Sequence, residues 1–196
     1  MVLEILKKGV GLALLLLLIS ACGEIGGSGQ CGGGEETGSC VRIESITPKY
    51  LDKNTSSVDV VQDNCGTSTD LVGFTTHNAE LVISNRPIPP LKKEDISDVT
   101  IQNVSISYVK VLCPGAICPP PLISRDLLGQ TVRVPVDGSV TVTLPFFDLA
   151  SKKEYTDGFG STLAFPRYNA NYRLTGTDSN KKSISVEGSA EFEIGN

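Results

Sequence analysis

The sequence predicts an all-β fold, an antiparallel β-sandwich of about seven or eight strands over residues 41–196. Three observations lead to this prediction. From Val41 onward apolar and polar residues alternate with a period of two, turn-forming residues separate the alternating runs, and no window of a dozen residues carries a helical stripe. Thr, Ser and Val, which suit strands with one face in water, are plentiful.

The last two runs predict a hairpin. Inward positions of the final run are Ile184, Val186, Gly188, Ala190, Phe192 and Ile194. The run before it places Ala170, Tyr172 and Leu174 inward, and residues 177–181 supply the turn. Gly188 among large apolar residues predicts a bulge or a close backbone approach.

Shorter runs extend the pattern toward the N-terminus. Their inward residues are Val41 and Ile43; Val58 and Val60; Ala79, Leu81 and Ile83; Val132, Val134 and Val136; and Val140, Val142 and Leu144. Pro135 marks an edge position, because proline cannot donate to a ladder. One run changes phase after Tyr108, where Val109 and Val111 follow Val104 and Ile106, which predicts a bulge or a crossing between sheets.

The number and spacing of these strands resemble those of immunoglobulin-like and fibronectin-like β-sandwiches. The resemblance rests on patterning over residues 41–196, because the chain has no Trp and therefore lacks the Cys…Trp…Cys signature of antibody domains. A β-barrel is the alternative architecture.

The N-terminus carries a second pattern. Lys7 and Lys8 precede an apolar run from Val10 to Ile19, and small residues then lead to Cys22. This order resembles the type II signal peptide of bacterial lipoproteins, with the lipobox at residues 19–22. The resemblance implies that residues 1–21 are removed and that Cys22 is acylated. An ordinary secretory signal is the alternative, whereas the 12 residues from Val10 to Ala21 are too few for a membrane-spanning helix.

A lipoprotein of this kind is a lipid-anchored membrane protein of the cell envelope. Two or three palmitate-like acyl chains hold a protein firmly, since each buried methylene contributes ~0.8 kcal/mol. Gly23 stands where an aspartate favours the inner membrane, so we expect the outer membrane. Residues 22–40 hold eight glycines after Cys22, which predicts a flexible tether of ~25 Å before the domain at 41–196.

Five cysteines remain after Cys22. An exported protein meets an oxidising compartment, which favours disulfides. Cys113 and Cys118 enclose a Pro-Gly turn and are expected to pair. Cys40 has two possible partners, Cys65 and Cys31, and the sequence leaves that choice open.

Enzymatic activity is not expected. The only histidine, His77, is placed in an exposed loop before the strand that starts at Ala79, and neither GxSxG nor HExxH occurs. We predict no cofactor and no metal. The carboxylate pairs that could bind calcium are Asp63 with Asp70 and Asp148 with Asp157. They are not densely spaced and are expected to cap loops instead.

The net charge of −5 argues against a nucleic-acid partner. Two proline-rich loops suggest a partner-docking patch, whose predicted residues are Ile88, Leu91, Leu122 and Ile123. The leading hypothesis is therefore a non-catalytic envelope lipoprotein whose sandwich binds or scaffolds another envelope component, which we expect to be a protein. The alternative is a surface module that binds carbohydrate or calcium, although few aromatic residues are present to form a sugar platform.

Overall fold

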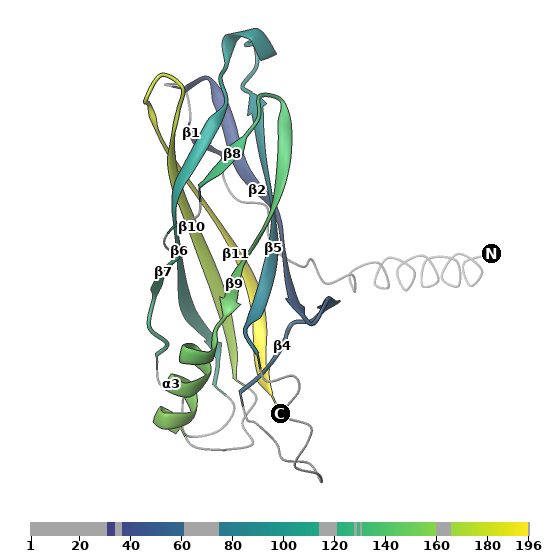
Figure 1. Cartoon of the computed structure of the whole chain (residues 1–196), viewed down its shortest axis with the longest axis vertical. Coiled ribbons are helices and arrows are strands. Elements are labelled where there is room, and N and C mark those ends of the chain that lie inside the picture. Colours follow the sequence, from purple (N-terminus) through teal and green to yellow (C-terminus); the bar gives the residue numbers. More distant parts are fainter. Residues whose placement is uncertain are drawn as a thin grey trace, which may run out of the picture.

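Two β-sheets pack face to face, with their strands along the long axis of the molecule (Figure 1). The computed structural model describes residues 31–33, 37–60, 75–113, 121–127, 129, 131–159 and 166–195. The first sheet contains β1 (Gly32–Gly33), β2 (Ser39–Tyr50), β5 (His77–Pro87) and β9 (Gly138–Phe147), in that order, with β3 (Lys53–Asn54) paired to β2. The second sheet contains β4 (Ser57–Asp59), β11 (Ser183–Gly195), β10 (Arg167–Asp178), β6 (Val99–Leu112) and β7 (Arg125–Leu127), in that order, with β8 (Val132–Val134) paired to β6. The predicted all-β class is confirmed.

The connections between the long strands follow a Greek-key path. In the first sheet the long strands lie in the order β2-β5-β9, and in the second they lie in the order β11-β10-β6. The chain therefore changes sheet between β5 and β6, between β6 and β9, and between β9 and β10. This arrangement corresponds to strands A-B-E and G-F-C of an immunoglobulin-type sandwich. No described strand belongs to both sheets, which agrees with a sandwich-like arrangement.

The core lies between the two sheets and contains a cluster of aromatic residues. The ring of Phe192 lies 5.0 Å from that of Phe146 and 5.5 Å from that of Phe147, measured between centroids. Tyr168 and Tyr108 lie 5.7 and 6.1 Å from the same ring. The Tyr108 hydroxyl donates a hydrogen bond of 2.7 Å to the backbone oxygen of Phe146. Both phenylalanines that end β9 are thus core residues.

The C-terminal hairpin is as predicted. Residues 167–177 of β10 pair with residues 193–183 of β11 without any shift of register. Asp178 closes the turn, because its Oδ1 accepts hydrogen bonds of 2.8 Å from the backbone nitrogens of Asn180 and Lys182. Lys181 adopts a positive φ of 64° in this turn. An Asx side chain that satisfies turn amides commonly stabilises such a loop.

Gly188 marks a close approach between the sheets and no bulge. It pairs regularly with Tyr172, and a Cβ at this position would lie 3.0 Å from Cδ1 and 3.2 Å from Cβ of Ile43 in β2. The predicted bulge at Gly188 is therefore wrong, and the close approach that requires glycine is that of the Ile43 side chain to the glycine backbone.

Replacement of Gly188 by valine is expected to lower the free energy of unfolding by about 1–3 kcal/mol, because the branched side chain overpacks against Ile43. Chemical denaturation followed by circular dichroism measures this change. Ser189→Ala, one residue along on the outer face, serves as control and should stay within about 0.5 kcal/mol of the wild type. A Gly188→Val protein as stable as the wild type would contradict the close contact.

The irregularities of β6 lie at different residues from the one predicted. Register against β10 shifts at Gln102 and at Val111, while Tyr108 keeps a regular inward position. Val109 and Val111 face solvent and are 54% and 46% exposed. Apolar residues on the outer face produce the pattern of a phase change. The predicted crossing between sheets is therefore wrong, and the bulge predicted near Tyr108 lies at Val111.

A helix and a short 3-10 turn interrupt the strands. Helix α3 (Leu149–Phe159) connects β9 with the segment before β10, and η1 (Lys93–Asp95) precedes β6. Asp148 caps α3, since its Oδ1 accepts a 2.7 Å hydrogen bond from the Ser151 nitrogen. Arg125 of β7 holds the helix by donating to Ser151 Oγ at 2.9 Å and to Glu154 Oε2 at 3.2 Å. The helix was not predicted, because a cap and ionic contacts stabilise it without an apolar stripe.

Part of the predicted tether belongs to the fold. Cys31 and Cys40 form a disulfide with a Cα–Cα distance of 4.8 Å, and β1 pairs antiparallel with β2. The folded unit therefore begins by Cys31 and not at residue 41. Residues 22–30 lie outside the described chain, so a tether there stays a prediction.

Candidate functional site

The four residues of the predicted docking patch do not form one surface. Ile88 donates its backbone N–H to the Gly38 oxygen at 3.0 Å, next to the start of β2, whereas Ile123 donates its backbone N–H to Glu154 of α3 at 3.2 Å. The loop after β5 and helix α3 lie at opposite ends of the sandwich (Figure 1). Ile88 and Leu91 follow β5, whereas Leu122 and Ile123 follow β6, and these consecutive strands run in opposite directions.

One of the four predicted patch residues is buried. Leu122 is 6% exposed and belongs to the core, while Leu91 and Ile123 are 40% and 61% exposed. The single docking patch is therefore a wrong prediction.

The structure tests only some of the cysteine predictions. Cys40 bonds to Cys31, so the Cys40–Cys65 pairing is wrong. Cys113 is also disulfide-bonded, to a partner outside the described residues. Since Cys118 lies outside them too, the Cys113–Cys118 bond stays a prediction, as does acylation of Cys22.

The carboxylates considered for calcium are engaged elsewhere where they are described. Asp148 caps α3, and its Oδ1 lies 3.5 Å from the Arg125 guanidinium. Asp157 pairs with Lys153 at 2.6 Å. Asp63 and Asp70 lie outside the described residues.

His77 lies in a buried cluster at the end of the sandwich that carries α3. It is the first residue of β5, is 2% exposed, and stacks on the Tyr50 ring with centroids 4.2 Å apart. The buried side chain of Lys152 places its Nζ 5.6 Å from the centroid of the same ring. The inward alternation of β5 thus starts at His77 and not at Ala79, so the expected exposed loop histidine is wrong.

Burial controls the protonation of this cluster. Desolvation, aided by the nearby Lys152 charge, lowers the pKa of His77 from 6.5 to about 4. Desolvation also lowers the pKa of Lys152 to about 8, against the opposing attraction of Asp59. No described residue accepts or donates a hydrogen bond at His77 Nδ1. A neutral, stacked imidazole without a hydroxyl or thiol partner in the described chain lacks the contacts of a catalytic base.

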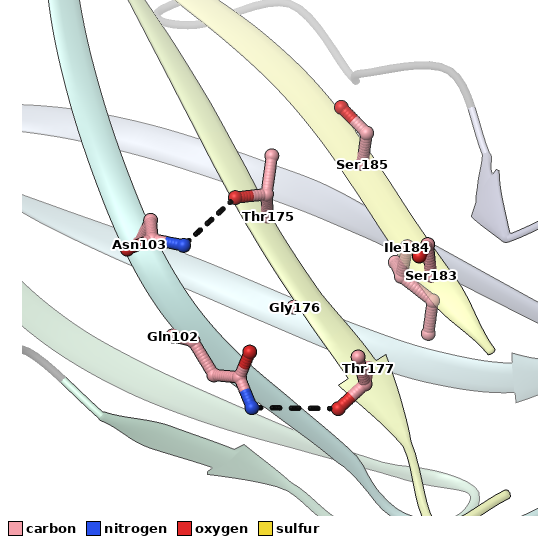
Figure 2. A pocket seen from close by; sticks show the side chains of 8 residues that line it. All are labelled: Gln102, Asn103, Thr175, Gly176, Thr177, Ser183, Ile184 and Ser185. Atoms are coloured by element: carbon pink, nitrogen blue, oxygen red, sulfur yellow. Dashed lines mark hydrogen bonds between the residues drawn. The ribbon is translucent and has the colours of Figure 1, made fainter. Parts of the chain in front are cut away.

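A second candidate is a polar pocket on the outer face of the second sheet (Figure 2), which we call the outer-face pocket. Its volume is about 350 Å³. The lining residues come from β6, β10 and β11: Gln102, Asn103, Thr175, Gly176, Thr177, Ser183, Ile184 and Ser185.

The bulge in β6 builds this pocket. Because Gln102 is the extra residue opposite β10, Gln102 and its neighbour Asn103 both project to the outer face. Gly176 lies opposite the bulge, where a Cβ would stand 2.0 Å from the Thr100 oxygen. Only glycine therefore allows β10 to lie against the bulged strand.

The amides in the pocket are only loosely engaged. Gln102 donates to Thr177 Oγ1 and Asn103 donates to Thr175 Oγ1, each at 3.5 Å (Figure 2). Good N–H···O bonds measure 2.7–3.2 Å, so these amide groups keep capacity for a better partner.

No titratable side chain lines the outer-face pocket. Arg173 and Glu187 stand two positions from the lining residues Thr175 and Ser185. They lie 3.6 Å apart, and Arg173 also donates to Ser185 Oγ at 3.4 Å. Sequence reasoning missed this site. Two signals were present: the polar pair Gln102-Asn103, which breaks the alternation of β6, and Gly176 within a strand.

Two further features that would indicate a type of function are absent from the part of the chain that the structure describes. Within it, no group of three or more His, Cys, Asp or Glu residues could hold a metal ion, and no helix is long and apolar enough to cross a membrane. No protein-family model, no curated protein and no solved structure matches the chain.

Proposed function

We propose that this chain is a lipid-anchored protein of the bacterial cell envelope, whose β-sandwich binds or scaffolds another envelope component without catalysing a reaction. The observation that carries the proposal is the disulfide between Cys31 and Cys40, nine residues after the lipobox cysteine. Disulfides persist in oxidising compartments, so this bond supports export of the chain. The signal-like residues 1–21 and Cys22 supply the means of export and the anchor. Gly23 favours the outer membrane.

The non-catalytic part of the proposal is supported by His77. The only imidazole of the chain is buried against Tyr50 with a pKa of about 4. A general base works best with a pKa near the operating pH and within reach of the proton that it removes.

Binding of a small ligand is the second candidate function. The outer-face pocket favours the carbohydrate form of this function over the calcium form, because its lining offers amides and hydroxyls and no carboxylate.

Replacement of Cys22 by serine is expected to abolish membrane anchoring. The wild-type chain should fractionate with membranes and show, by intact mass, a protein that begins at residue 22 with acyl groups attached. The variant should lack the mass of the acyl groups. In a detergent phase-separation experiment it should move from the detergent-rich phase to the aqueous phase, because the acyl chains no longer contribute to the free energy of membrane binding.

A matched control replaces both Cys31 and Cys40 by serine. This control removes the disulfide and should leave the acyl mass and the membrane association unchanged. An unmodified wild-type mass that still includes residues 1–21 would overturn the lipoprotein proposal.

A further inference from the structure

We propose that the outer-face pocket binds a neutral saccharide, and that it does so in the membrane-proximal half of the sandwich. The ligand class follows from the lining of the pocket alone. The membrane-proximal placement rests on the proposed lipid anchor.

The lining residues match the hydrogen-bonding character of a saccharide. Thr175, Thr177, Ser183 and Ser185 each carry a hydroxyl that donates and accepts, and Gln102 and Asn103 each carry a separate donor and acceptor. A saccharide hydroxyl likewise donates and accepts. The two amide contacts at 3.5 Å are long enough for ring hydroxyls to replace them with shorter bonds.

The charge of the pocket favours a neutral ligand over a phosphate. An anion bound there would find no cation in the lining, and Arg173 is already close to Glu187. Strong phosphate sites use bidentate arginines or several cations. A neutral polyhydroxylated ligand requires neither.

The position of the pocket argues against an extended peptide. At Thr175–Thr177 the strand β10 is paired on both sides, with β6 and with β11. The backbone groups of β10 there are therefore used within the sheet, so a peptide strand, which relies on a free sheet edge, cannot pair with β10 at the pocket.

The chain path places the pocket near the anchor. β1 lies beside β11, since a Cβ on Gly32 would stand 2.3 Å from the backbone oxygen of Ser185, which lines the pocket. Cys31 is fixed to the start of β2 by its disulfide. Cys31 is nine positions after Cys22, and a chain of that length spans at most about 30 Å. The pocket therefore lies at the end of the sandwich that the proposed anchor holds near the membrane, where a saccharide could be free or be the headgroup of a glycolipid.

The test uses the full lipidated chain in phosphatidylcholine vesicles, with hydrogen–deuterium exchange measured by mass spectrometry. One arm adds a panel of free neutral oligosaccharides (maltotriose, cellotriose, mannotriose and triacetylchitotriose), and another arm includes a neutral diglycosyl diacylglycerol in the vesicles. A third arm includes phosphatidylglycerol. At a ligand concentration of ten times the dissociation constant, exchange in residues 100–104 and 175–185 should slow about tenfold.

The pocket variant combines Asn103→Ala with Thr175→Val, and the matched control combines Asn171→Ala with Ser107→Ala. Asn171 and Ser107 face each other on the same two strands, outside the pocket. The pocket variant should lose the slowing and the control should keep it. Hydrogen–deuterium exchange in the other strands, measured without ligand and compared with the wild type, shows whether both variants are folded.

Each outcome decides one part of the proposal. Slowing by free saccharide alone assigns a soluble ligand, and slowing by the glycolipid vesicles assigns a lipid headgroup. The proposed site is overturned if neither the free saccharides nor the glycolipid slows hydrogen exchange in the pocket. It is also overturned if only phosphatidylglycerol slows exchange, or if the control variant loses the slowing as fully as the pocket variant. If the mass shows no acylation while free saccharide still slows exchange in the pocket, the anchor and the membrane-proximal placement fail and the saccharide site stands.

Discussion

Replacement of Phe192 by alanine is expected to lower the free energy of unfolding by about 3–5 kcal/mol. Phe192 is 1% exposed, and four aromatic rings from β6, β9 and β10 lie within 6.1 Å of its own ring. Truncation removes the transfer free energy of a large ring. It also leaves a cavity between residues of both sheets, which cannot collapse without moving β9 toward β10.

Equilibrium denaturation in urea gives the size of this loss. Ile123→Ala removes an apolar side chain that is 61% exposed, and should change the free energy of unfolding by less than about 0.5 kcal/mol. Phe192→Leu should fall between the two. A Phe192→Ala protein that unfolds at the same urea concentration as Ile123→Ala would show that the aromatic cluster does not hold the sheets together.

The stability of the domain is expected to fall as the pH is lowered from about 6.5 to about 4, in part because of His77. The folded-state pKa of about 4 lies below the ordinary value of 6.5, so the unfolded chain binds the proton more readily within this window. The contribution of His77 is complete above pH 6.5 and is lost as the pH falls toward 4. The difference between the two pKa values corresponds to about 3 kcal/mol.

His77→Phe separates this contribution from that of the carboxylates, which titrate in the same range. Phenylalanine keeps the ring stacked on Tyr50 and does not titrate. We expect the variant to match or exceed the wild type at pH 7, and its free energy of unfolding to fall less steeply down to pH 4. Parallel pH profiles for the two proteins would show that His77 binds its proton equally well in the folded and the unfolded state, and would contradict the lowered pKa.

The sequence was sufficient to predict the strands, because alternation reports directly which side chains face the core. The inward residues of β5, β9, β10 and β11 are those that a period of two selects. Helix α3 escaped prediction since its stability comes from the Asp148 cap and from Arg125, a residue more than 20 positions away. The phase of β6 was misjudged because Val109 and Val111 are apolar and yet exposed.

The candidate site was predicted less well than the fold, for a physical reason. A pocket on a sheet face depends on which residue is extra in the ladder, and only the pairing of β6 with β10 identifies Gln102 as that residue. The burial of His77 likewise depends on Tyr50 and Lys152, which come from β2 and α3. Local patterning carries no information about such neighbours. The docking patch failed because the sequence does not say at which end of the sandwich each loop lies.

The disulfide between Cys31 and Cys40 also determines how the domain would bear mechanical load. A pull on the proposed anchor, with the other end of the sandwich held, reaches Cys31 and crosses the covalent bond to Cys40, so the two-residue strand β1 carries no tension. The force then runs along β2, whose ladder bonds to β5 lie perpendicular to the strand in an antiparallel pair. Those bonds are sheared together and are not unzipped one after another. Under the proposed anchoring, a bond between residues nine positions apart would direct force from the membrane into a long strand of the first sheet.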